Sequence, residues 1–193
     1  MKTKFILLFL ILLISHSAIS QFSVGISIGG IGYHPKQDKN TDFYKWKIFN
    51  HRKVVGFSAL SLLLSYRINN YVGIKVVQSM IFHDCAGKFA GISHLGVDFH
   101  DDIIGWESQR DQFSFSFGPL WYYRKNWTQE LTYTNDPTFI TLSENKVWEN
   151  KFVWHGGQIE YAYFFQQNNA FTVNVLPGYP YLYTFGIGAK TNY

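Results

Sequence analysis

The stretch FSFSFGPLWYYR, residues Phe113 to Arg124, alternates apolar and polar side chains more cleanly than any other part of the chain. In an extended strand, successive side chains point to opposite faces. The phenylalanines up to Phe117 therefore share one face, and the serines between them share the other with Gly118. This pattern predicts a β-strand with one apolar and one polar surface.

The same alternation recurs along the rest of the chain, and no segment after the N-terminal region is long and apolar enough for a membrane helix. Strands of about 9–11 residues, in an even number, are what a tilted transmembrane barrel requires. We therefore expect an all-β fold, an eight-stranded antiparallel transmembrane β-barrel spanning residues 21–193. The eight predicted strands span residues 22–33, 57–68, 71–82, 89–99, 113–124, 158–165, 171–175 and 181–193.

The connections between these strands differ in length at the two ends of the predicted barrel. Two long, charged connections would lie on the outer side, whereas most inner connections are short, as is typical of outer-membrane barrels. The predicted outer loops span 34–53, 84–88, 125–149 and 176–180, and the predicted inner turns span 68–70, 100–111 and 166–169.

The distribution of side chains over the two faces separates a membrane barrel from a soluble one. A secreted β-sandwich or a lipocalin-like barrel also alternates but turns its apolar face inward. Here one face carries Ser, Gly, Gln, Glu, Lys and Asp, whereas the other carries Leu, Ile, Val and Phe with Tyr and Trp near the strand ends. Aromatic residues make up 19% of the chain, and an aromatic girdle at the membrane interface explains both their number and their position.

The N-terminus has the features of a secretory signal peptide. Lys2 and Lys4 precede the apolar run Phe5–Ile14, and small residues follow at Ala18 and Ser20. The run is too short for a membrane anchor, which needs about 20 residues. We expect cleavage after residue 20, a mature chain from residue 21, and location in a bacterial outer membrane.

Charge and cysteine content exclude several classes of partner. Without the two leader lysines the formal charge falls from +4 to +2, and no basic run concentrates it, so no nucleic-acid partner is expected. The only cysteine, Cys85, cannot form an internal disulfide. The sequence indicates no cofactor.

Four segments carry a family resemblance, namely HDCAGKFAGISHLGV, FGPLWYYRKNW, VWHGGQIEYAY and VLPGYPYLYTFGIGA. Together they resemble the small outer-membrane β-barrel proteins of Bacteroidota-type bacteria over nearly the whole mature chain. In architecture the chain is also similar to the eight-stranded OmpA/OmpX-type barrels. The resemblance implies the fold and carries no activity with it.

The residues His83, Asp84 and Cys85 contain reactive types in a row. In a strand His83 and Asp84 point to opposite faces, so we expect a hairpin tip in which Gly87 adopts a positive φ, rather than a catalytic dyad. One Cys and one His also lack the paired spacing of a zinc site, and no metal site is predicted.

A second comparison concerns the lipid A deacylases, outer-membrane barrels that carry a Ser/His hydrolase site on the lipid face. Ser93 and His94 invite this comparison, but the His-x-Ser-Asn arrangement is absent and the two neighbours face opposite sides of a strand. His155 and Glu160 offer another base and acid, and they share a face only if the glycine pair between them forms a bulge. We predict no catalytic residues.

The inward-facing charges form a more coherent group. An eight-stranded barrel has an interior wide enough only for side chains, so charges there must pair. We expect a lumen network that excludes a wide pore, with a proton or ion path as the alternative. Its predicted members are Arg67, Lys75, His94, Asp98 and Glu160, with Arg124 as a further candidate.

The long outer loops are the candidate binding region, because aromatic anchors among polar residues are typical of recognition surfaces. Trp46, Trp127 and Trp148 are the candidate anchors, and the alternative is that such aromatics sit on the rim at the lipid headgroups. Two functions remain open. One is a non-enzymatic barrel, in contact with outer-membrane lipid, whose loops dock another outer-membrane protein as an accessory subunit of a larger complex. The other is a small lipid hydrolase or acyltransferase.

Overall fold

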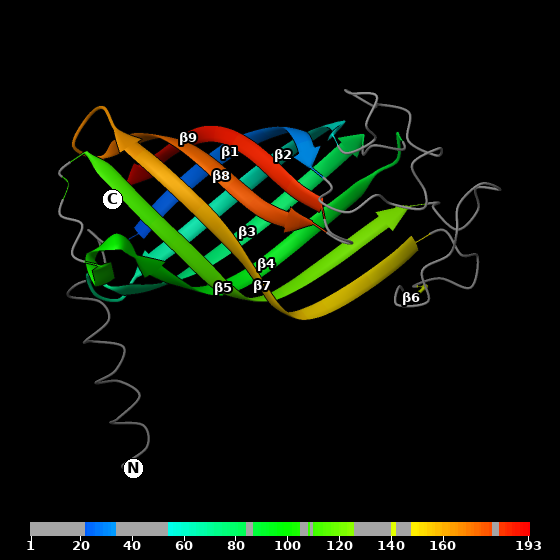
Figure 1. The fold of residues 1–193 in the computed structure, drawn as a ribbon, viewed down its shortest axis with the longest axis horizontal. Helices are drawn as coiled ribbons and strands as arrows, with labels where there is room; N and C mark the ends of the chain where they lie inside the picture. The colour runs from blue at the N-terminus through cyan, green and yellow to red at the C-terminus, as the bar shows by residue number, and fades with distance from the viewer. Residues whose placement is uncertain are drawn as a thin grey trace, which may run out of the picture.

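The computed structural model describes residues 22–33, 54–83, 87–104, 108, 110–125, 140–141, 148–178 and 182–193. These residues form a single antiparallel sheet that curls round on itself (Figure 1). Its elements in chain order are β1 (Phe22–Tyr33), β2 (Val54–Arg67), β3 (Val72–His83), β4 (Ala90–His100), the 3-10 helix η2 (Asp101–Ile104), β5 (Asp111–Lys125), β6 (Ile140–Thr141), β7 (Trp148–Phe164), β8 (Asn169–Gly178) and β9 (Leu182–Asn192).

The sheet closes because β1 pairs with β2 on one side and with β9 on the other, while β5 pairs with β7. Eight strands make the wall, and the two-residue β6 pairs only with the outer part of β7. The predicted eight-stranded antiparallel barrel is therefore confirmed. Among the described residues, no helix is long and apolar enough to cross a membrane.

The exposed face of the barrel is apolar and its enclosed face is polar. Ile28 and Ile187 on the outside are 60% and 61% exposed, whereas Lys75 and Glu160 on the inside are each 2% exposed. Burying charge while exposing isoleucine is unfavourable in water and favourable in a bilayer, so this is a transmembrane barrel rather than a lipocalin-like one.

Local chemistry explains the tight connections. Asn69 ends β2 because its side-chain Oδ1 accepts hydrogen bonds from the backbone N–H groups of Tyr71 and Val72, both at 2.9 Å. Gly87, before β4, has a φ of 75°, which confirms the positive φ predicted for that hairpin. Asp84 and Cys85 of the same hairpin, the proposed signal peptide (residues 1–20), and Trp46 and Trp127 lie outside the described residues.

The sequence prediction was wrong about where the strand after the longest loop begins. β7 starts at Trp148 rather than near residue 158, so Trp148 belongs to a strand and not to an outer loop. The sequence His155-Gly156-Gly157 interrupts the alternation because the strand is irregular there. The pairing of β5 with β7 shifts register between Gly118 and Leu120, which hid the outer half of β7.

Candidate functional site

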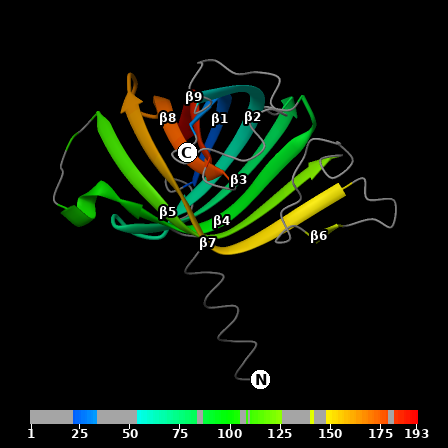
Figure 2. The same ribbon diagram turned by 45° about the vertical axis from the view of Figure 1, so that its right-hand side comes forward.

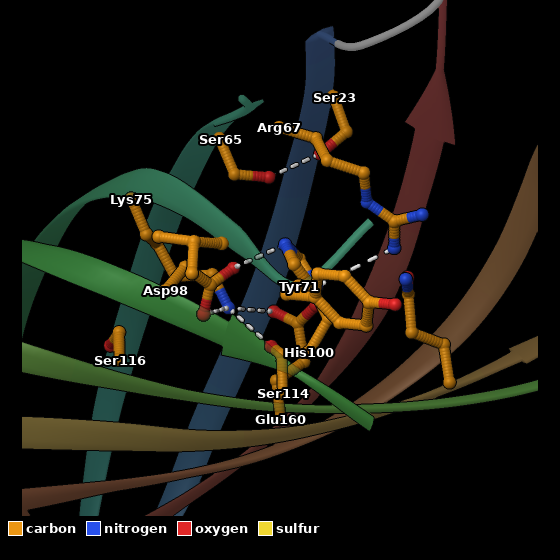
Figure 3. Close-up of polar contacts among 12 residues, drawn as sticks. Ser23, Ser65, Arg67, Tyr71, Lys75, Asp98, His100, Ser114, Ser116 and Glu160 are labelled. Carbon is orange, nitrogen blue, oxygen red and sulfur yellow. Dashed lines mark hydrogen bonds and ion pairs between the residues drawn. The ribbon is translucent and has the colours of Figure 1, made fainter. Parts of the chain in front are cut away.

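A cluster of four charged side chains closes the inner half of the lumen. Lys75 on β3 lies 3.3 Å from Asp98 Oδ1 on β4 and 3.5 Å from Glu160 Oε2 on β7, measured from Lys75 Nζ. Lys190 on β9 lies 2.8 Å from Glu160 Oε1. Figure 3 shows Lys75 reaching towards Asp98, Ser114 and Glu160. Two cations face two anions, so the cluster carries no net charge and ties one wall of the barrel to the other.

Neutral groups add hydrogen bonds to the two lysines of this charge cluster. Lys75 Nζ donates a hydrogen bond to Ser114 Oγ at 2.9 Å, and Lys190 Nζ donates one to Gln112 Oε1 at 3.3 Å. Asp98 Oδ1 makes its ion-pair contact with Lys75 but accepts no hydrogen bond. Buried ions need such additional partners, because ion pairing alone does not repay their lost hydration.

The inner end of the lumen, next to the short turns, continues the polar filling. Arg67 lies within 3.5 Å of His100 Nδ1, measured from Arg67 Nη2, and His100 Nε2 lies 3.9 Å from Asp98 Oδ2. The hydroxyl groups of Ser23 and Ser65 are hydrogen-bonded to each other on the neighbouring wall (Figure 3). Arg67 is only half-buried, so it forms the edge of the network rather than its centre.

His94 occupies a separate position, at the irregular segment of β5. Its Nδ1 lies 3.0 Å from the Pro119 carbonyl, which can only accept, so Nδ1 carries the proton. Its Nε2 lies 2.9 Å from Ser116 Oγ and therefore accepts from that hydroxyl. Gly96 leaves room for the ring, since a Cβ there would lie 2.6 Å from His94 Nε2. His94 thus holds β5 at Ser116, just before its register shift, and at Pro119, within the shift.

The outer half of the lumen is apolar, which alternation alone did not predict. The buried side chains there are Phe57, Ile81, Ile92, Leu120, Tyr122 and Leu176. Beneath them a small cavity of about 20 Å³ is lined in part by Ser61, Ser79, Gln158 and Asn174. Such a cavity holds about one water molecule. Above the apolar layer, Arg124 Nη2 pairs with Glu149 Oε2 at 2.8 Å. Apart from this small cavity, side chains fill the lumen along the part of the barrel that the structure describes.

Five residues were named from sequence for the lumen network, and the structure places all five side chains on the lumen side. It brings Lys75, Asp98 and Glu160 into direct contact, links Arg67 through His100, and puts His94 against β5 instead.

Several partners of these residues were missed. Lys190 follows the inward alternation of its strand and was identifiable from that signal. Glu149 was hidden because it had been assigned to a loop, and Arg124 is its partner.

The candidate hydrolase residues do not come together. Ser93 faces the lipid side, where its Oγ donates to Gln78 Oε1 at 2.6 Å, whereas His94 faces the lumen. His155 is exposed, whereas Glu160 is buried between two lysines. His94 does meet a serine, Ser116, but that serine is fully buried. Within the described part of the chain, no group of three or more His, Cys, Asp or Glu side chains is placed to hold a metal ion.

The lipid-facing surface carries a hydrogen-bonded group near its outer end. Gln78 Nε2 donates to the Tyr123 hydroxyl at 2.9 Å while Gln78 Oε1 accepts from Ser93, so their polar atoms are paired within the protein. The Tyr123 ring lies over Gly91, where a Cβ would come within 2.2 Å of it. Trp148, one of the candidate anchors, stacks edge-on against Phe89 at 5.9 Å between ring centroids. Trp148 is therefore part of an aromatic belt at the rim.

These features define a class, a small transmembrane β-barrel with a filled lumen. No protein-family model matches the chain, and no curated protein sequence matches it significantly. Similar solved structures include the N-terminal β-barrel domain of OprF from Pseudomonas aeruginosa, at 13% identity over 89% of this chain and 97% of that one, with a TM-score of 0.49. The attachment invasion locus protein Ail of Yersinia pestis is also similar, at 12% identity over 90% of this chain and 99% of that chain, with a TM-score of 0.49.

The outer membrane protein OprG from Pseudomonas aeruginosa is also similar, at 12% identity over 90% of this chain and 98% of that chain, with a TM-score of 0.43. At these values a likeness carries no information on activity. The fold is assigned from the strand pairing and the side-chain distribution of the chain itself.

Proposed function

We propose that the protein is a bacterial outer-membrane barrel, exported by its N-terminal signal peptide, that docks a partner protein at its outer end and does not conduct solutes. In this role it is a non-enzymatic accessory subunit of a larger outer-membrane complex. The apolar outer face of the barrel contacts the lipid, and the part of the molecule beyond the membrane binds the partner protein.

The observation that supports this proposal is the filling of the lumen. A salt-bridged cluster, an apolar layer and an Arg124–Glu149 pair follow one another along the axis, so solute passage would require breaking buried ion pairs. If the barrel does not conduct solutes, the surfaces available for binding are its two ends and its lipid-facing side. The lipid face has its polar atoms paired internally near the rim, and the outer end carries the long connections.

The experiment is to isolate the protein at its native level from its own membranes and compare variants by native electrophoresis. We expect the wild type to fractionate with the outer membrane and to migrate in an assembly larger than the isolated barrel. Replacing residues 126–139 by a short Gly-Ser linker should release the barrel from that assembly. Replacing the inner segment 105–107 in the same way is the matched control and should leave the assembly intact.

Recovery in the soluble fraction would contradict the membrane assignment. Migration of the wild type as an isolated barrel, or loss of the assembly only in the inner-end variant, would contradict docking at the outer end.

A further inference from the structure

Among the described residues, one edge of β7 has no neighbouring strand over its middle part. β5 pairs with β7 from Trp148 to Tyr163, but on the opposite edge β8 pairs only with Ile159–Phe164 and β6 only with residues 149 and 150. Between them, no other described strand pairs with Phe152–Gly157 on this side. Figures 1 and 2 both show the outer half of β7 turning away from β8. We call Phe152–Gly157 the open edge.

Glycines at the register shift between β5 and β7 explain why β7 turns away from β8 there. Gly118 of β5 allows a close approach, because a Cβ there would lie 2.2 Å from the Leu95 carbonyl oxygen. Across the ladder, a Cβ on Gly156 would lie 1.7 Å from Leu120 Cδ1. His94 then fixes the bend by bonding both Ser116 and Pro119. Glycines and a bulge of this kind bend strands and end pairing.

The orientation of the backbone leaves hydrogen-bonding groups at the open edge. The Lys125 N–H donates to the carbonyl of Phe89, the residue just before β4, at 2.9 Å, so it points away from β7. Because bonded and non-bonded pairs alternate in an antiparallel ladder, the pair of Trp121 with Phe152 is also non-bonded. The N–H and C=O of Phe152 therefore point towards the open edge.

Side chains next to these groups are large and exposed. Trp154 is 76% exposed and Phe152 is 49% exposed, and their rings stack edge-on with centroids 4.8 Å apart. Here two aromatic side chains lie beside a strand edge with which no described strand pairs. Strand-addition recognition uses these two elements, namely main-chain hydrogen bonds and alternating side-chain contacts.

The open edge belongs on the water side of the membrane. Unpaired backbone groups are not tolerated in hydrocarbon, where each costs several kcal/mol. β5 and β7 have 15 and 17 residues, against 10 and 11 for β8 and β9, and Figure 1 shows their outer ends extending past those of β8 and β9. The extra length carries the edge beyond the lipid belt.

We propose that the open edge, Phe152–Gly157, is a docking site at which an extended segment of a partner protein adds to the sheet as a new strand, with Phe152 and Trp154 as its apolar anchors. The inference rests on the proposed docking function and specifies the surface and the mode of binding. The partner segment is a peptide with β-branched or aromatic residues at alternate positions.

A second copy of this chain does not fit the site. Two barrels in one membrane are related by an axis along the membrane normal, and their strands tilt by about 35–45° from it. Two copies of β7 would then cross at about twice that angle, roughly 70–90°, which is neither parallel nor antiparallel. A flexible segment of another protein has no such constraint.

The test compares amide hydrogen exchange, measured by mass spectrometry, in outer-membrane vesicles and in the purified protein reconstituted in lipid nanodiscs. In nanodiscs we expect the edge-facing amide of Phe152 to exchange about 100-fold faster than the paired amides of Ile159–Phe164. In native vesicles it should become protected. A photoreactive benzoylphenylalanine in place of Trp154 should then crosslink to a protein segment identified by its peptide masses.

Two variants separate the backbone from the side chain. Phe152→Pro removes the edge-facing donor, which an edge strand tolerates, and should abolish both protection and crosslinking. Phe152→Val keeps the donor in a strand-forming residue but removes the aromatic ring, so it should retain more protection than Phe152→Pro and less than the wild type.

Slow exchange of the edge in nanodiscs would mean that the chain covers it itself and would overturn the proposal, as would crosslinking only to lipid or to a second copy. If the native assembly persists while Phe152→Pro leaves it unchanged, docking stands and this site is wrong. If the wild type forms no native assembly, the proposed docking function itself is contradicted, and the docking site with it.

Discussion

Glu160 is the residue on which the charge cluster of the lumen depends most, because it pairs with both Lys75 and Lys190. Glu160→Gln keeps the size and shape of the side chain but leaves two buried ammonium groups facing the single carboxylate of Asp98. Removing one partner of a buried ion pair costs about 3–5 kcal/mol, because the remaining charge is uncompensated. We expect the free energy of unfolding to fall by about that amount.

The compensating change is Lys190→Met in the same chain. The cluster then holds one cation, Lys75, and one anion, Asp98, which lie 3.3 Å apart in the native protein. The double variant should regain about 2–3 kcal/mol relative to Glu160→Gln, within the range of coupling energies for contacting residues. Gln167→Glu, at an exposed turn, is the charge-change control and should stay within about 0.5 kcal/mol of wild type.

The assay is reversible urea unfolding in lipid vesicles, followed by tryptophan fluorescence. A Glu160→Gln variant within about 0.5 kcal/mol of wild type would refute the reasoning, because the charges would then be solvated by water rather than by each other. A double variant less stable than the single one would refute it as well.

Three further predictions use other parts of the barrel. Gly87→Ala should lower the free energy of unfolding by about 1–2 kcal/mol in the same assay, because its φ of 75° is strained for any residue with a Cβ; no loss would contradict the strained turn. His94→Leu should cost about 1–3 kcal/mol by leaving the Pro119 carbonyl without its donor, whereas His94→Gln, which keeps a donor, should cost less; equal losses would contradict the clamp. Cys85→Ser should leave folding unchanged, and lipid A from cells with and without the protein should have the same acyl-chain masses; a mass difference abolished by Cys85→Ser would support an enzyme instead.

The sequence predicted which way side chains point much better than what they touch. Period-two alternation placed Lys75, Asp98 and Glu160 in the lumen, because neighbouring residues of a strand must face opposite sides. It did not specify that Glu160 would meet Lys190. That contact crosses the lumen, and it depends on the stagger between strands that are distant in the chain.

The main feature that the sequence prediction missed is the outer part of β7, where its pairing with β5 shifts register. His155 and the following glycine pair break the alternation, so the sequence prediction gave residues 150–157 to no strand and placed Trp148 and Glu149 in a loop. His94 was considered next to Ser93, its neighbour in sequence, whereas its partner Ser116 is on the adjacent strand. Both errors arise because a bulge is defined by two strands together and leaves only a weak signal in each.

Ion conductance of the purified wild-type protein in planar lipid bilayers tests the closed lumen most directly. With Lys75, Asp98, Glu160 and Lys190 paired across the barrel and an apolar layer above them, the account predicts a silent membrane at moderate voltage. Steady, porin-like current steps from folded barrels would contradict it.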